Sequence, residues 1–149
     1  MIDMWIPSIP RGQARVRHTR CGMAYKDKAQ RLDEIRLSVL MRPHKPENPM
    51  TGPIRMHLVV DFPIPPSKSK AWKLDALRGI HRPTGRPDLS NVIKHVEDIL
   101  QSQGFFINDS QIVDVRASKH YSETPGYLIV LTPESPEESV VQNMTEVSR

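Results

Sequence analysis

Two acidic residues and a lysine are the part of this sequence with the clearest chemical potential. Asp88 begins an amphipathic segment, Lys94 follows within it, and Asp109 lies in a polar stretch beyond its end. Protein-bound Mg²⁺ takes a few carboxylates and keeps water and phosphate oxygens as its other ligands. An ion held by Asp88 and Asp109 would activate water against a phosphodiester, and Lys94 would stabilise the negative charge that develops. The pattern is compatible with metal-assisted phosphodiester hydrolysis.

Each of these residues also has an ordinary structural role. Asp is a favoured helix N-cap, so Asp88 could simply cap the helix that follows it. Asp109 lies in an Asn-Asp-Ser stretch typical of turns, and a solvated helix face accounts for Asn91 and Asp98. The catalytic interpretation requires the helix to pack on a sheet, so that Asp88 comes near the start of the next strand and meets Asp109. Spacing alone leaves both interpretations open.

The elements that would position these residues follow from hydrophobic periodicity. Strands are expected over residues 4–9, as an edge strand, and over 54–62, 112–121 and 127–132, with two short strands around 21–22. The strands over 112–121 and 127–132 are joined by a Pro-Gly turn, which suggests a hairpin. Helices are expected over 27–41, 67–77 and 89–103. The first has Leu32, Ile35 and Val39 at helical spacing, and Gly104 is the expected C-cap of the last.

These elements predict an α+β fold in which a small mixed or antiparallel sheet is covered on one face by helices. The chain has 149 residues, 38% of them hydrophobic and 26% charged, which is the composition of one globular domain. We expect residues 1–132 to form that domain and residues 133–149 to be an acidic, loosely structured tail.

The sequence contains no run of about 18 apolar residues, so no membrane span and no membrane partner are predicted. The first residues lack the basic and apolar regions of an export signal, and the lone Cys21 cannot form an internal disulfide. A cytoplasmic location is expected.

Charge is distributed unevenly along the chain. The formal total is +4, but residues 133–149 carry four glutamates and one arginine, so residues 1–132 carry +7. The excess lies in two windows, 11–31 and 68–86. A basic body favours a polyanionic partner such as nucleic acid, with a merely soluble basic surface as the alternative.

Three histidines and an aromatic pair have weaker claims to function. His81, His95 and His120 do not share a metal-ligand spacing, which favours positions at the surface. Phe105 and Phe106 are expected in the core, and a wedge between DNA bases is the alternative.

Two stretches carry a resemblance to a known family. Arg86-Pro-Asp-Leu-Ser-Asn-Val-Ile-Lys-His-Val-Glu-Asp-Ile-Leu100 and Gly104-Phe-Phe-Ile-Asn-Asp-Ser-Gln-Ile-Val113 closely resemble the RusA family of Holliday junction resolvases. The similarity is strongest over residues 86–119 and weaker over residues 6–40. It implies a RusA-like fold and a homodimeric, Mg²⁺-dependent endodeoxyribonuclease of DNA recombination and repair. The basic segment over residues 67–82 looks like that of phage- or prophage-type members.

The resemblance also implies roles for individual residues. Asp88 matches the first Asp of the family's Asp-x-Asp-Asn motif, a metal ligand, and Asp109 matches the later acidic ligand. Asn91 and Lys94 match the Asn and the functionally important Lys that follow. By the same resemblance, Mg²⁺ or Mn²⁺ on Asp88 and Asp109, with Ser90 and water as further ligands, would deliver hydroxide to the scissile phosphate.

Ser90 is the departure from this pattern, because it stands where the family usually has a second Asp. The site therefore has one negative charge fewer. Metal binding is weaker, another acid such as Asp98 or Asp114 compensates, or the protein binds branched DNA with little cleavage. The sequence leaves these three alternatives open.

Symmetric cutting of a four-way junction needs two opposed active sites, which a two-fold homodimer would supply. The basic windows would contact the phosphates of junction or branched DNA and govern affinity more than sequence choice. A different class of function, hydrolysis of nucleotides by a metal-dependent enzyme, predicts little salt-sensitive binding to DNA. The candidate DNA contacts are Arg15, Arg17, Lys68, Lys70, Lys73, Arg82 and Arg86.

Overall fold

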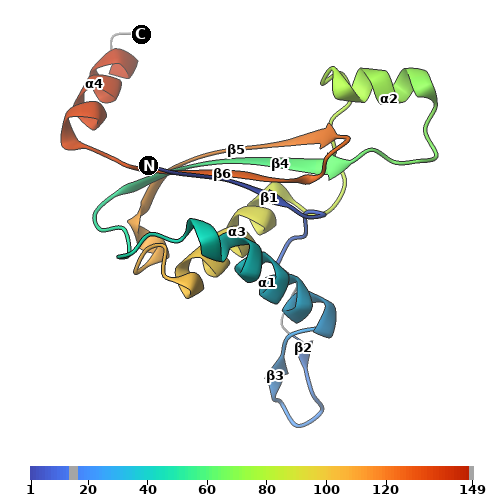
Figure 1. The fold of residues 1–149 in the computed structure, drawn as a ribbon, viewed down its shortest axis with the longest axis horizontal. Coiled ribbons are helices and arrows are strands. Elements are labelled where there is room, and N and C mark those ends of the chain that lie inside the picture. Colours follow the sequence, from blue (N-terminus) through green and yellow to red (C-terminus); the bar gives the residue numbers. More distant parts are fainter. Residues whose placement is uncertain (14–16, 148–149) are drawn as a thin grey trace.

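The computed structural model describes residues 1–13 and 17–147, and its centre is a four-stranded sheet (Figure 1). The sheet has the order β1-β6-β4-β5, with β4 parallel to β5 and the other neighbours antiparallel. The strands are β1 (Ile2–Pro7), β4 (Ile54–Pro63), β5 (Ile112–Ser122) and β6 (Gly126–Pro133). The sheet is therefore mixed, and β1 is the edge strand that its prolines predicted.

The predicted hairpin between the last two strands is wrong, because β4 lies between β5 and β6 in the sheet. β4 pairs with β5 on one side and with β6 on the other, and every second side chain from Ile54 to Phe62 is buried on the covered face of the sheet. The connection from β4 to β5 passes through helical segments, as a parallel pair requires.

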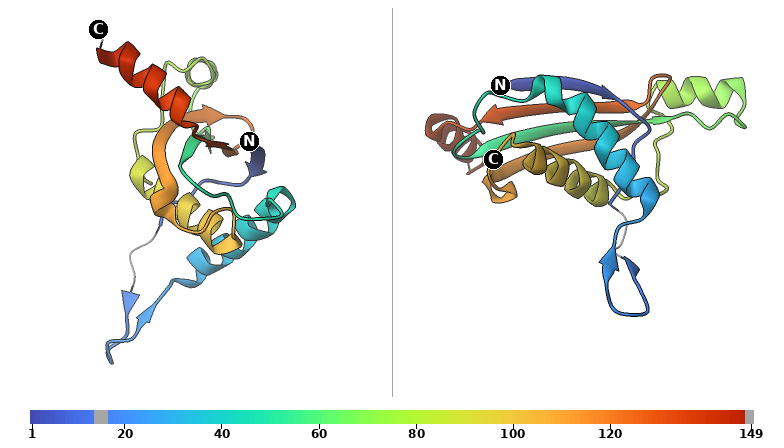
Figure 2. Two further views of the ribbon diagram at one scale, coloured as in Figure 1. Left: turned by 90° about the vertical axis from the view of Figure 1, so that its left-hand side faces the viewer. Right: turned by 60° about the horizontal axis from the view of Figure 1, so that its bottom comes forward.

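Two helices, α1 (Lys28–Met41) and α3 (Leu89–Gln103), cover the same face of the sheet (Figures 1 and 2). The apolar side of α3 buries Val92, Val96 and Leu100 against the sheet core, and Gly104 ends the helix with φ 85°, as predicted. The α+β class with helices on one face of the sheet is confirmed.

The expected orientation of α1 is wrong, although its bounds agree with the prediction. Leu32, Ile35 and Val39 are 57%, 60% and 55% exposed. The helix instead buries Leu37 and Met41. These two residues share a face with the buried Asp33. The contact of Asp33 with His95 on α3 fixes the rotation of the helix. Within the described chain, the apolar stripe of Leu32, Ile35 and Val39 is therefore left largely exposed at the surface.

The remaining elements lie at the periphery (Figures 1 and 2). A hairpin of β2 (Arg17–His18) and β3 (Ala24–Tyr25) projects beyond α1, and α2 (Lys70–Leu77) lies past one end of the sheet. Short 3₁₀ helices are η1 (Arg42–His44) and η2 (Asp109–Gln111). Where a loose tail was expected, the chain forms helix α4 (Pro136–Val147). In the described part of the chain, no helix has the length and apolar character needed to cross a membrane.

Candidate active site

Asp88 occupies the N-cap position of α3, with φ −64° and ψ 143°. Its backbone carbonyl accepts hydrogen bonds from the amides of Asn91 and Val92, both at 3.1 Å. Among the described residues, however, its carboxylate makes no capping hydrogen bond, and the residue is exposed. The Asp88 side chain therefore does not have the capping role that the sequence left open, and its carboxylate is available to a ligand.

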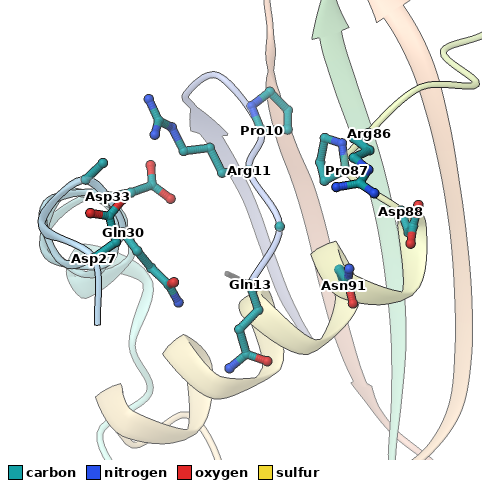
Figure 3. Close-up of a pocket in the computed structure, with 12 residues that line it drawn as sticks. Pro10, Arg11, Gln13, Asp27, Gln30, Asp33, Arg86, Pro87, Asp88 and Asn91 are labelled. Carbon is teal, nitrogen blue, oxygen red and sulfur yellow. The ribbon is translucent and has the colours of Figure 1, made fainter. Parts of the chain in front are cut away.

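A cavity of about 650 Å³ lies between the N-terminal parts of α1 and α3. In Figure 3, residues of α1 line one side of it, Asp88 and Asn91 line the other, and Arg11 and Gln13 lie between. Arg86 also lines the cavity. The structure thus brings together Arg86, Asp88 and Asn91, three residues that the sequence predicted to act together.

The segment after β1 holds this cavity in shape. The amide of Arg11 donates to the hydroxyl of Tyr127 at 2.9 Å, and the Gln13 side chain donates to the Asp98 carboxylate at 2.6 Å. Gly12 passes so close to α3 that a Cβ atom there would lie 2.8 Å from Cβ of Pro87. Only glycine fits at this crossing, which positions the loop that leads into Asp88.

A buried pair connects the two helices at this cavity. Nε2 of His95 on α3 lies 3.0 Å from Oδ2 of Asp33 on α1, and their side chains are 1% and 7% exposed. The prediction of a surface position is therefore wrong for His95. Asp33 lines the cavity, and His95 follows Asn91 by one helical turn, so the pair fixes the spacing between the two walls.

Lys94 lies on a different side of α3 and contacts two carboxylates. Its Nζ donates to Oδ2 of Asp109 at 2.9 Å and approaches Oδ1 of Asp98 at 3.0 Å. The hydrogen bond to Asp109, followed by that to Asp98, raises the pKa of Lys94 above its usual range. The same hydrogen bond lowers the pKa of Asp109, whereas burial raises that of the neighbouring Glu97. This group, the Lys94 cluster, comprises Lys94, Asp98 and Asp109.

The turn that carries Asp109 is built as its sequence predicts. Oδ1 of Asn108 accepts a hydrogen bond from the amide of Ser110 at 2.9 Å, and Oε1 of Gln111 accepts one from the amide of Asn108 at 3.0 Å. The amide of Asp109 itself donates to Oε1 of Gln101, near the end of α3. The turn is therefore attached to the C-terminal half of the helix.

The expected meeting of Asp88 and Asp109 does not occur within the described chain. Asp98 and Asp109 both contact Lys94. Asp98 follows Asp88 by ten residues, or about 15 Å along the helix. Lys119 on β5 donates to the carbonyl of Pro87 at 2.9 Å, so Asp88 lies beside Lys119. Lys119 is about 23 Å from the start of β5. Two ligands of one Mg²⁺ ion lie within about 4 Å of each other. That part of the prediction is wrong, because α3 runs from one end of β5 to the other.

Ser90 is exposed and, as far as the structure describes the chain, does not line the cavity of Asp88. Nor do the described residues contain a group of three or more histidine, cysteine or acidic side chains placed to hold a metal ion. Asp114, considered as a substitute ligand, lies 3.1 Å from Arg55 on the neighbouring strand. Asp98 belongs to the Lys94 cluster. Neither acid compensates for Ser90 beside Asp88.

The candidate DNA contacts lie in three places. Arg17 belongs to the projecting hairpin, and Arg86 lines the cavity. Four others lie on or beside α2, where Lys68, Lys70 and Arg82 are exposed and Lys73 is half-buried. Arg15 lies outside the described residues. Phe105 and Phe106 are fully buried, which confirms the core position over the DNA wedge.

Sequence reasoning missed Asp33 and Arg11, which line the cavity. One sequence feature could have identified Asp33. It is spaced four residues from Leu37 and eight from Met41, so it lies on the helix face that becomes buried. A charged residue on the buried side of a helix needs a partner. Nothing in the sequence near Arg11 indicated its position.

Comparison with known proteins identifies the family of this chain. Residues 6–132 match the family model described as Endodeoxyribonuclease RusA. The chain is also similar to "Uncharacterized protein YqaN" of Bacillus subtilis (strain 168), with 44% identity over 84 residues that cover 55% of this chain and 58% of that protein. The chain thus matches little more than half of that relative's length. Since the family model covers well over half of the chain, including β4, β5, both covering helices and the whole cavity of Asp88, this chain belongs to the RusA endodeoxyribonuclease family.

Proposed function

We propose that this protein is an endodeoxyribonuclease that resolves Holliday junctions by symmetric phosphodiester hydrolysis and acts in the cytoplasm. The observation that carries the proposal is the uncapped carboxylate of Asp88, which stands beside Asn91 and Arg86 at an open cavity. Family membership supports nuclease activity, junction DNA as the substrate and a need for a divalent metal. A carboxylate and an amide oxygen are hard ligands of the kind that Mg²⁺ takes.

Mg²⁺, with Mn²⁺ as a substitute, is the proposed ion, but the donors of one chain do not fit a single metal centre. Asp88 and Asp109 lie too far apart to bind the same ion, and Lys94 already occupies the space between Asp98 and Asp109. Ser90 adds no charge. Arg86 lines the cavity and is the residue we expect to bind a phosphate there, while Lys94 carries a positive charge throughout the physiological pH range.

A homodimer is proposed, with the exposed stripe of Leu32, Ile35 and Val39 on α1 as the surface that a second copy covers. A contiguous exposed apolar surface of this kind is typical of protein interfaces. Two-fold symmetry would place two copies of the Asp88 cavity on one junction, which symmetric cutting requires.

The test of the proposed function is cleavage of an end-labelled four-way junction in Mg²⁺ and in Mn²⁺. We expect paired, symmetric nicks from the native protein and none from Asp88→Asn. The matched control is Asp3→Asn, which changes an exposed aspartate on the edge strand β1 and should leave the nicks unchanged.

The second candidate is a protein that binds branched DNA with little or no cutting. It is favoured by Ser90 and by the separation of Asp88 from Asp109. Tight, salt-sensitive junction binding without product in either metal would support this candidate and reject the nuclease. Restored cleavage in Ser90→Asp would show that the missing carboxylate is the reason.

A further inference from the structure

A cluster of three rings lies at the base of α2 beside Lys68, one of the candidate DNA contacts, and the rings themselves have no role in the function described above. The ring centroids of Trp72 and His81 lie 4.6 Å apart, with their planes within 9° of parallel. Tyr121 meets the Trp72 ring edge-on at 5.5 Å, and Nζ of Lys68 lies 4.9 Å from its centroid. We call these four residues the Trp72 cluster.

The cluster is part of a strongly basic projection. Residues 67–86 carry six lysines and arginines against one aspartate, and Figure 1 shows α2 standing beyond the end of the sheet. Proteins that bind single-stranded nucleic acid combine a positively charged surface with aromatic rings on which bases stack. Both features coincide here, whereas a purely phosphate-binding surface needs no rings.

The projection is held in place, so its rings are ordered before any ligand arrives. Oγ of Ser69 caps α2 by accepting from the amide of Trp72 at 3.2 Å. Nε of Arg82 donates to the carbonyl of Lys119 on β5 at 3.0 Å. Tyr121, on the same strand, contacts Trp72 directly. A preordered surface loses less conformational entropy on binding.

The Trp72 ring can accept a base at little cost. Lys68 is exposed, and a cation–π contact at an exposed site is weaker than the stacking of a base on an aromatic ring. An incoming base would therefore displace the ammonium group. Lys68 could then contact the phosphate of that nucleotide, so the displaced charge is used again.

The cluster also lies close to the cavity of Asp88. Lys119 and Tyr121 are two residues apart on β5, about 7 Å. Tyr121 contacts Trp72, while Nζ of Lys119 donates to the carbonyl of Pro87 at 2.9 Å. A base stacked at Trp72 would therefore belong to the DNA strand that passes Asp88.

We propose that the Trp72 cluster binds an unpaired base of branched DNA by stacking. This inference rests on the proposed function and names the feature of the substrate that the site recognises, an unstacked nucleotide at the branch point. Stacking is tolerant of base identity, because every base has a π-face. The cluster would therefore select the DNA structure and not its sequence.

The first test uses the fluorescence of Trp72 in Trp5→Phe, which leaves Trp72 as the only tryptophan of the chain. We expect an oligothymidylate of about ten nucleotides to quench this fluorescence on binding, because the base stacks on the indole. Inorganic polyphosphate, which offers charge without bases, should bind without quenching. The proposal is overturned if labelled oligothymidylate reaches saturation by anisotropy while the fluorescence stays unchanged.

Variants supply the second test. Trp72→Leu should weaken oligothymidylate binding about tenfold, and Trp72→Phe should stay within about threefold of the native protein. Trp5→Leu, a tryptophan replaced on the distant strand β1, is the matched control and should bind normally. Equal affinity of Trp72→Leu and native protein would reject the stacking site.

The junction cleavage assay separates this inference from the proposed function. Quenching by oligothymidylate in a protein that does not cut would keep the stacking site and reject the nuclease. Symmetric cutting by a protein whose Trp72 fluorescence is not quenched would support the nuclease and reject the stacking site.

Discussion

Lys94 and His95 are neighbours in α3, and each pairs with an aspartate, but the two pairs lie in different surroundings. His95 meets Asp33 at 3.0 Å in the interior, where 1% and 7% of the two side chains are exposed. Lys94 meets Asp109 at 2.9 Å near the surface, with 48% and 34% exposed. In a buried pair each partner has lost its water, so removing one leaves the other unsatisfied. An exposed pair exchanges its partner for water at little cost.

The difference separates the two tasks of one helix. The His95 side of α3 joins the walls of the cavity that holds Asp88, so its pair determines where the carboxylate stands. The Lys94 side keeps a cation at the surface, where its bonds to Asp98 and Asp109 can open when a phosphate approaches. Under the proposed function, the charges that change partners on DNA binding therefore lie where the fold does not depend on them.

The largest expected effect comes from breaking the buried pair. Asp33→Ala removes the partner of His95 and leaves a buried imidazole without its hydrogen bond, so we expect the free energy of unfolding to fall by about 3 kcal/mol. Urea unfolding followed by circular dichroism measures this loss. Lys94→Ala is the matched control on the same helix and should lower the urea midpoint only slightly, because its pair with Asp109 is exposed.

A double-mutant cycle sharpens this comparison. His95→Ala should cost about as much as Asp33→Ala, and the double variant should cost much less than the two together, because both remove one interaction. Additive losses would show that the two residues stabilise the protein independently and would remove the pair as the connection between α1 and α3.

The next effect concerns activity with little loss of stability. The family resemblance assigns Lys94 the role of stabilising charge near the substrate, so we expect Lys94→Met to slow junction cleavage about 100-fold. Because the pair with Asp109 is exposed, the unfolding midpoint should change only slightly. Lys94→Arg, which retains the charge, should recover part of the rate. Unchanged cleavage by Lys94→Met would confine Lys94 to holding the Asp109 turn.

The helix that carries both pairs could be predicted from the sequence in detail. Its apolar residues recur at helical spacing, and Gly104 marks its end, so local signals were sufficient. In α1 the same reasoning gave the bounds but the wrong buried face. The contact that rotates this helix joins Asp33 to His95 across 62 residues, and no local pattern encodes it.

Strand pairing and the site show the same limit. A Pro-Gly turn predicts that the chain reverses between β5 and β6, but it does not say whether another strand lies between them. The grouping of Arg86, Asp88 and Asn91 was predictable because they are close in sequence. The meeting of Asp88 with Asp109 depended on the direction in which α3 crosses the sheet, and this is a property of the whole fold.

The smallest expected effect is the pH dependence of the exposed pair. The hydrogen bond to Lys94 lowers the pKa of Asp109 below its ordinary 3.8, so this stabilisation is present above that value and is lost as the pH falls through the lower pKa of the folded protein. The pKa of Lys94 is raised above 10.5, so its contribution is full below 10.5 and is lost only as the pH rises through the higher folded value. Between about pH 5 and about pH 9 both groups stay charged. The small stability difference between the native protein and Lys94→Met should therefore be constant across that range and shrink below about pH 4. A difference that changes between about pH 5 and about pH 8 would come from another group, either the neighbouring Glu97 with its raised pKa or an imidazole, and would mean that the exposed pair does not act separately.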